Sequence, residues 1–217
     1  MPILSKRLVD GYFSFKKTLD IKTREQYKTL AAKGQNPEIM VVACCDSRVS
    51  PEIIFDTDPG EMFVIRNISN LIPPFCPDGS YHATSSALEY GVQRLNVNHI
   101  LVLGHEDCGG IAGALSHTPS EKQNSDFIDK WLDLLEDLSL PLRENDNLKM
   151  SEKCIILEQE SLSQSITNLR SYPWIAEREQ KGLIKLSAAW FSIETHNLWV
   201  LNEQNGRFCK LNEDFIA

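Results

Sequence analysis

Hydrophobic runs and helical stripes alternate along this chain and predict an α/β fold. Three short segments are apolar at nearly every position, as is typical of parallel strands buried on both faces: residues 39–44, 62–65 and 100–103. Between the second and third segments, residues 84–95 show the spacing of a crossover helix. This order predicts two strands, a helix and a third strand in a mainly parallel sheet.

The N-terminal segment has a helical periodicity of its own. Four apolar side chains recur at helical spacing, namely Leu4, Leu8, Tyr12 and Phe15. Residues 27–32 continue in a helical pattern that ends near Gly34. We therefore expect a helical arm over residues 1–33 ahead of an α/β core over residues 34–217. Because the arm has no domain of its own to cover its stripe, it should pack on another surface.

The middle of the core predicts further helices. A short helix should follow Gly109 and Gly110, and Ser125 can cap the next one. The apolar stripe of the helix after Ser125 consists of Phe127, Trp131, Leu134, Leu135 and Leu138. A later helix should end at Tyr172 and Pro173. Its stripe consists of Ile155, Leu162, Ile166 and Leu169.

The last part of the chain predicts an antiparallel edge. Residues 184–194 and 198–201 have strand patterns joined by a tight turn, and Asn205 and Gly206 turn the chain once more. The chain shows no internal repeat and no flexible linker, so its 217 residues are expected to form one domain. The predicted fold class is α/β, with a mainly parallel central β-sheet, flanking helices and an N-terminal helical arm.

The composition and charge of the chain exclude some kinds of binding partner. The formal net charge is −8, the isoelectric point is about 5.2, and no cluster of Lys or Arg compensates locally. Such a chain does not attract phosphate backbones, so we expect no nucleic-acid partner. No signal peptide or membrane-length apolar run is recognisable, so we expect a cytoplasmic protein that does not bind membranes. The six cysteines then indicate reduced thiols or metal ligands more than a disulfide framework.

Candidate ligands follow two of the predicted strands. Cys44 ends the first apolar run, while His105 and Cys108 come directly after the third, in the stretch GHEDCGG. Ligands of open α/β sheets bind at the C-terminal strand ends, where these residues should meet. Two thiolates and one imidazole suit zinc, and three protein ligands leave a fourth position for water.

Other interpretations of these residues must be weighed against a metal site that contains Cys44, with a catalytic pair beside it. A lone HxxC is weak evidence, because a buried Cys often acts as a small hydrophobic residue. Cys45 rivals Cys44 as the ligand, although adjacent side chains on a strand point to opposite faces, so that only one can reach the metal. Asp46 and Arg48 could form a structural ion pair. Beside a ligand cysteine we favour a catalytic pair, in which Arg48 grips a carboxylate that orients the nucleophile.

The motifs together resemble the β-class carbonic anhydrases. The family's CxDSR motif is present as residues 44–48 and its HxxCGG motif as residues 105–110. Residues 59–74, 86–90, 168–175 and 188–193 also fit the family's running pattern, so the resemblance extends over residues 35–208. Departures from that pattern are Cys45 in place of serine, Ala83 in place of glycine, and two acids, Glu106 and Asp107, between the ligands.

The resemblance implies a role for each matching residue. Zn2+ would be bound by Cys44, His105 and Cys108, with Asp46 and Arg48 as the catalytic pair beside it. The substrate pocket would consist of Gln35, Gly109, Phe63, Ile68 and Tyr90. Gln35 is typical of the plant-like branch of the family, and the last three residues would come partly from a partner subunit. The chain is therefore expected to form a homodimer or a higher homo-oligomer.

The implied activity is that of a zinc lyase, carbonate dehydratase. Zinc-bound hydroxide would add reversibly to carbon dioxide to give bicarbonate. One alternative is hydrolysis of carbonyl sulfide or carbon disulfide at the same site, since these small linear molecules demand similar geometry. Another is a non-catalytic, zinc-stabilised interaction module. That alternative needs a fourth protein ligand, and the sequence offers none besides Asp46.

Overall fold

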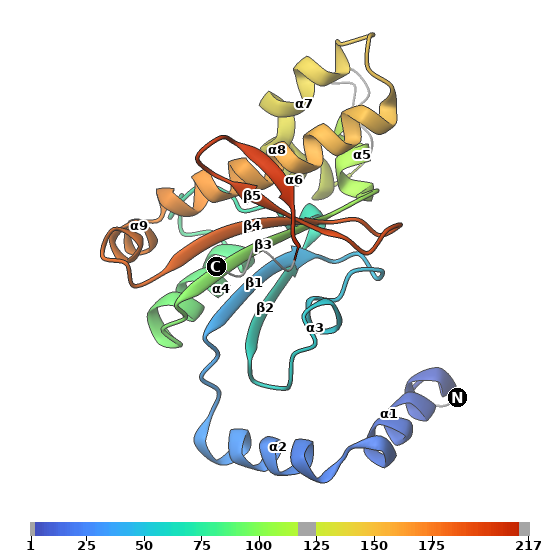
Figure 1. The fold of residues 1–217 in the computed structure, drawn as a ribbon, viewed down its shortest axis with the longest axis vertical. Helices are drawn as coiled ribbons and strands as arrows, with labels where there is room; N and C mark the ends of the chain where they lie inside the picture. The colour runs from blue at the N-terminus through green and yellow to red at the C-terminus, as the bar shows by residue number, and fades with distance from the viewer. Residues whose placement is uncertain (1–2, 117–124, 213–217) are drawn as a thin grey trace.

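The structure, a computed structural model, describes residues 3–116 and 125–212. Within these residues a six-stranded sheet has the order β2-β1-β3-β4-β5-β6 (Figure 1). The strands are β1 (Ile39–Cys44), β2 (Met62–Asn67), β3 (His99–His105), β4 (Lys185–Phe191), β5 (Leu198–Asn202) and β6 (Arg207–Lys210). The first four run parallel to their neighbours, and β5 and β6 add an antiparallel edge. The predicted fold class is confirmed.

Two strands end at other residues than predicted, because each strand ends where its pairing with the neighbouring strand stops. The third strand extends to His105, because His105 still pairs with Phe191 of β4. The fourth strand ends at Phe191 rather than at residue 194, because the chain turns there and the Ser192 N–H donates to the Asn197 carbonyl oxygen at 2.9 Å. His105 is thus the last residue of a central strand.

Most of the predicted helices are confirmed. The crossover consists of α4 (Ala83–Glu89) and a π-helical turn η2 (Tyr90–Arg94), and α5 (Gly109–Ser116) follows the glycine pair. Gly91 lets the crossover approach β1 closely, since a Cβ there would lie 1.8 Å from the present position of Met40 Cε. The crossover helix therefore packs directly on β1.

Two predictions in the helical half need correction. The single helix expected after Ser125 is divided into α6 (Ile128–Leu132), η3 (Asp133–Leu135) and α7 (Glu136–Arg143), although Ser125 Oγ does accept from the Ile128 and Asp129 N–H groups. The long helix α8 (Met150–Ser171) ends as predicted, but Pro173 then starts α9 (Pro173–Gln180), because proline suits the first helical position. Two short turns, α3 (Pro51–Ile54) and η1 (Ile68–Asn70), were also not predicted.

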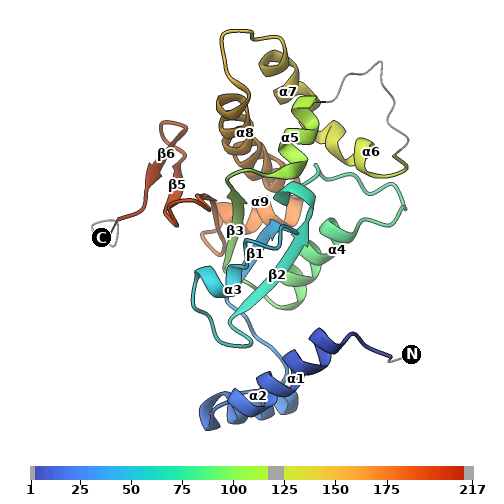
Figure 2. The same cartoon turned by 90° about the vertical axis from the view of Figure 1, so that its right-hand side faces the viewer.

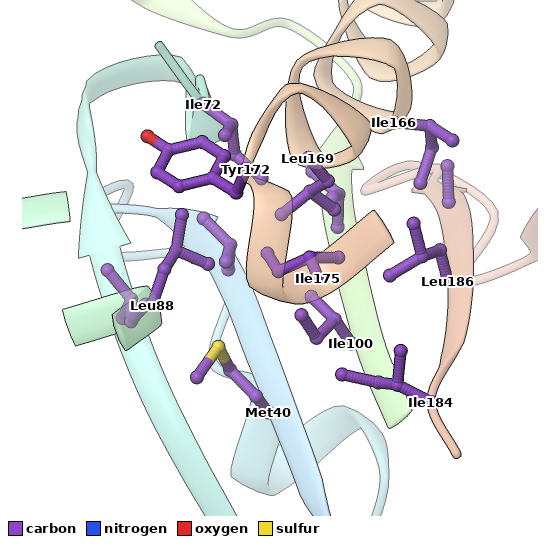
Figure 3. Packing of buried hydrophobic residues seen from close by; sticks show 14 of the residues in the cluster. Met40, Ile72, Leu88, Ile100, Ile166, Leu169, Tyr172, Ile175, Ile184 and Leu186 are labelled. Atoms are coloured by element: carbon purple, nitrogen blue, oxygen red, sulfur yellow. The ribbon is translucent and has the colours of Figure 1, made fainter. Parts of the chain in front are cut away.

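Successive side chains of β1 are buried on alternate faces of the sheet. Met40 and Val42 pack with α4, α8 and α9 on one face of the sheet, whereas Val41 and Ala43 pack on the other face, beside α3. Figure 3 shows the first of these layers, with side chains of the strands facing those of the helices; among them are Met40, Leu88, Ile100, Leu169, Tyr172, Ile175 and Leu186. The same alternation places Cys44 on the face of Met40 and Val42.

The N-terminal arm lies to one side of the sheet (Figures 1 and 2). It consists of α1 (Lys6–Thr18) and α2 (Ile21–Lys33), neither of which has a buried residue, and the first two residues of the expected arm lie outside the described residues. Its contacts with the core include a hydrogen bond from Gln26 Nε2 to the Pro59 carbonyl oxygen at 2.8 Å. The stripe side chains Leu8 and Tyr12 are 60% and 55% exposed. The apolar face of the arm is therefore not covered by any other part of the chain that the structure describes.

Candidate metal centre

Three ligand-type side chains converge at the C-terminal ends of β1 and β3. The ligand atoms of Cys44, His105 and Cys108 all lie within 4.8 Å of one another, and all three residues are buried. The two sulfur atoms are 4.0 Å apart. Parallel pairing brings the ends of β1 and β3 together, and Asp107, with a φ of 55°, turns the chain so that Cys108 faces back toward Cys44. The predicted convergence of these three residues is confirmed.

The histidine is prepared to act as a ligand. His105 Nδ1 lies 2.8 Å from the Glu106 carbonyl oxygen, an arrangement in which Nδ1 carries the proton and donates it. The lone pair then belongs to Nε2, which is buried and has no hydrogen-bond partner among the described residues. Buried polar atoms normally have a partner, and a ligating histidine typically donates its second nitrogen to an oxygen in this way. The Nε2 atom therefore fits a metal ion.

The two thiols share their protons unequally. The hydrogen bond from Cys44 lowers the pKa of Cys108 to about 3, and the same hydrogen bond raises the pKa of the Cys44 thiol. Burial opposes the charged form of His105, but the negative charge of the neighbouring Cys108 outweighs burial and raises the pKa of the imidazole. The pair is thus a thiolate and a thiol held together by one proton. A divalent cation can replace that proton, because metal binding by thiols releases protons.

Asp46 and Arg48 form a close pair beside this cluster. Asp46 Oδ1 accepts from Arg48 Nε at 3.0 Å, and Oδ2 accepts from Arg48 Nη2 at 2.8 Å. These bonds hold the pKa of the Asp46 carboxyl far below its usual range. Arg48 Nη2 also donates to the Asp107 carbonyl oxygen at 2.9 Å. The arginine therefore fixes an ionised carboxylate and ties it to the turn that carries Cys108.

Two charged residues that sequence reasoning did not assign to the site support the ligands. Arg66 donates to the carbonyl oxygens of Cys44, Asp46 and Val49 at 2.6–2.8 Å and so shapes the loop after β1. Glu158 of α8 accepts from the Cys108 N–H at 3.0 Å and from Trp190 Nε1–H at 2.9 Å.

A sequence signal for Glu158 existed. It lies four residues before Leu162, in register with the apolar stripe of its helix, and it is only 2% exposed. Burial raises its pKa to about 7, against the two hydrogen bonds that it accepts. A carboxylate in this position costs free energy unless it has partners, so its place in the stripe indicates a polar contact in the core.

The predicted substrate residues fall into two groups. Ile68 and Gly109 lie at the metal cluster: Ile68 directly follows Asn67, the partner of Cys44 in the sheet, and also lines a cavity of about 740 Å3. Phe63 pairs with Met40, four residues before Cys44 and so about 13 Å along the strand. The Tyr90 ring is 5.9 Å from that of Phe63.

Gln35 lies ahead of β1, at the far end of that strand from Cys44. A single chain therefore does not bring Gln35, Phe63 and Tyr90 to its own metal cluster.

The departures from the family pattern leave the cluster unblocked. Glu106 Oε2 accepts from Ser192 Oγ at 2.8 Å and from the Glu194 N–H at 3.1 Å, so this acid is directed toward the loop after β4. Cys45 is exposed, in contrast to Cys44, and is not part of the ligand cluster. Cys44 therefore lies in the cluster and Cys45 outside it, and the role of Cys44 as the metal ligand stays a prediction.

Comparison with known proteins agrees with this geometry. The sequence model of the carbonic anhydrase family, described as "Carbonic anhydrase", matches residues 39–198. Beta carbonic anhydrase 6, mitochondrial, of Arabidopsis thaliana is 34% identical over 202 residues, which are 91% of this chain and 68% of that protein. The chain is a β-class carbonic anhydrase. Beta carbonic anhydrase 3 of the same plant is 35% identical and is covered over 77% of its length, against 91% of this chain.

Solved structures of β-carbonic anhydrases have the same fold. The β-carbonic anhydrase CcaA matches with a TM-score of 0.87 and 28% identity, over 95% of this chain and 98% of that one. A structure from a study of two tetrameric β-carbonic anhydrases of Sordaria macrospora matches with a TM-score of 0.73 and 27% identity, over 95% and 96% of the two chains. Within residues 3–116 and 125–212, no helix combines the length and apolar character that a membrane span needs.

Proposed function

We propose that this carbonic anhydrase is a zinc enzyme that interconverts carbon dioxide and bicarbonate. The observation that carries the proposal is the buried Nε2 of His105, which has no hydrogen-bond partner among the described residues, in a side chain that converges with the sulfur atoms of Cys44 and Cys108. Two soft sulfur ligands and an imidazole are a zinc-type donor set with an open fourth position. When bound there, zinc would lower the pKa of a water molecule and so supply a nucleophile near neutral pH.

The chain's own groups then orient the reactants. Asp46, kept ionised by Arg48, accepts a hydrogen bond from the attacking water and directs its lone pair toward the carbon atom. The Gly109 N–H lies at the exposed start of α5, where it can donate to a substrate oxygen. Because Arg48 holds both oxygens of the carboxylate, Asp46 is kept off the metal position and the fourth site stays open.

We also propose that the site is completed by a second copy of the chain. Gln35, Phe63 and Tyr90 lie away from their own metal cluster, so in the proposed assembly they would line the pocket of the partner subunit. The uncovered stripe of the arm supports a homodimer or a larger homo-oligomer. The tetrameric relatives from Sordaria macrospora support the same inference. The cytoplasmic location stays a prediction, since one relative carries the name of a mitochondrial enzyme.

The test is a carbon dioxide hydration assay on the purified protein, on a chelator-treated sample, and on that sample after zinc is added back. We expect activity that is lost with the metal and returns with it. Faster turnover of carbonyl sulfide or carbon disulfide than of carbon dioxide would identify a hydrolase instead. Stoichiometric zinc without turnover of any of the three substrates would indicate the non-catalytic module.

A further inference from the structure

Ser69 contacts both sulfur atoms of the metal cluster. It lies in η1, directly after β2, and is 1% exposed. Its backbone N–H donates to Cys44 Sγ at 3.3 Å, and its Oγ lies 3.4 Å from Cys108 Sγ. One residue from η1, an element that supplies none of the three candidate ligands, therefore contacts both thiols.

The surroundings confine the Ser69 hydroxyl to this position. The backbone of Ser69 is left-handed, with φ 61° and ψ 23°, which directs its N–H group at Cys44. Trp131 Nε1–H holds the preceding residue by donating to the Ile68 carbonyl oxygen at 2.9 Å. A Cβ on Gly110 would lie 2.1 Å from Ser69 Oγ, so only glycine at position 110 leaves room for the hydroxyl. Among the described residues, Cys108 Sγ is the hydrogen-bond partner of that hydroxyl.

The direction of the hydroxyl bond depends on the state of Cys108. A Cys108 thiol donates to Ser69 Oγ, whereas a thiolate can only accept, and the hydroxyl then turns to donate to it. Both contacts of Ser69 become donor bonds once a metal ion has replaced the thiol protons. Hydrogen bonds to a thiolate draw electron density from the sulfur, so the sulfur gives less of it to the metal.

We propose that Ser69 is a positioning residue that donates hydrogen bonds to both thiolate ligands and thereby keeps the bound zinc electron-poor. This inference rests on the proposed zinc function and deepens it. Two anionic ligands neutralise a divalent ion more than neutral ligands do, and the Ser69 bonds offset part of that effect.

The test uses the full chain with Co2+ in place of zinc, because the thiolate-to-cobalt charge-transfer band reports the energy of the sulfur lone pairs. Ser69→Ala and Ser69→Gly both remove the hydroxyl, but only glycine also relieves the left-handed backbone. We expect the band to move to lower energy in both variants by a similar amount. The control is Ser139→Ala, which removes an equally buried hydroxyl within α7 and should leave the band in its wild-type position.

The other outcomes contradict the inference. An unchanged band in both variants, whatever happens to stability, would show that the hydroxyl only fills space. A shift in the alanine variant that glycine restores to the wild-type position would assign the effect to backbone strain. If the wild-type chain itself binds neither Co2+ nor zinc, the proposed zinc function fails together with the Ser69 inference. If the wild-type chain binds metal but the band does not move in the Ser69 variants, only the Ser69 inference fails.

Discussion

Cys44 and Cys45 are neighbours in the chain but differ in their surroundings. Cys44 is buried against Cys108, and Cys45 is exposed. We therefore expect Cys44→Ser to lose both zinc and hydration activity, and Cys45→Ser, the matched control, to keep both. Metal analysis of the two purified variants checks this, and zinc loss in Cys45→Ser alone would reverse the assignment.

Arg48 is expected to orient Asp46 and not to bind the metal. It fixes the Asp46 carboxylate without touching the metal cluster, so Arg48→Ala should lower turnover by about 10- to 100-fold while zinc stays bound. Arg48→Lys should be impaired too, since lysine cannot make the two-pronged bond. Arg170→Ala is the control, because Arg170 pairs with Glu179 and Glu203 at the opposite end of the sheet. Normal turnover of Arg48→Ala would refute the proposed role.

Sequence reasoning works for these residues because their signal is local. Cys44, Asp46 and Arg48 follow one strand, and His105 and Cys108 follow another, so that parallel pairing alone brings them together. Arg66 and Ser69 lie at and directly after the end of β2, and Glu158 lies in the apolar stripe of α8, but none of the three belongs to a ligand motif. Each meets the site through a contact with a distant segment, and such contacts depend on how elements pack.

At the scale of the elements, the helix α8 supports the site by placing Glu158 beside Cys108. It spans Met150–Ser171 and packs its apolar stripe on β3 and β4, and this places Glu158 between Cys108 and Trp190. The boundaries that the sequence did not predict have local causes as well. Proline at position 173 both ends α8 and starts α9, and the segment 128–143 keeps its apolar stripe while its backbone breaks at Asp133–Leu135. Periodicity reports the buried face of a segment and not the continuity of its backbone.

Glu158→Gln tests the link between α8 and the metal turn. The two carboxylate oxygens accept one bond each, and a glutamine has a single acceptor oxygen, so one buried donor is left unpaired. We expect the free energy of unfolding of the metal-free protein to fall by about 1–3 kcal/mol. Denaturant titration measures this, with Glu160→Gln, on the exposed side of the same helix, as the control. Equal stabilities of the two variants would contradict the prediction.

At the scale of the whole molecule, the arm is the part whose apolar side chains stay exposed in a single chain. Leu8, Tyr12 and Phe15 form an apolar face without a cover, although the Phe15 ring does contact Tyr27 across the two arm helices. The fold class and the helical arm were predictable from periodicity. Periodicity does not identify the surface that covers the arm, and its packing on a partner subunit stays a proposal. The division into an arm and one core domain stays a prediction.

Removal of residues 1–33 should weaken subunit association. If Gln35, Phe63 and Tyr90 complete the partner's pocket, hydration activity should fall together with the oligomer. Sedimentation velocity over a range of protein concentrations measures the association. In the full chain, Tyr12→Ser should have a smaller effect in the same direction, and Lys17→Ser, on the polar side of α1, should have none. A truncated chain that stays associated and active would show that the arm is dispensable.

The two hydrogen bonds that Glu158 accepts, one from Trp190 Nε1–H and one from the Cys108 backbone N–H, have a consequence for biosynthesis. Translation delivers Cys44 long before Trp190, and the hydrogen bond from Trp190 that fixes Glu158 beside Cys108 forms only after β4 has joined the sheet. The metal is therefore expected to enter the finished polypeptide and not the nascent one, because a preformed site is absent from the unfolded chain. Ribosome-bound chains that stop before β4 should hold no stoichiometric zinc, and until release their two thiols stay open to oxidants and to competing metal ions.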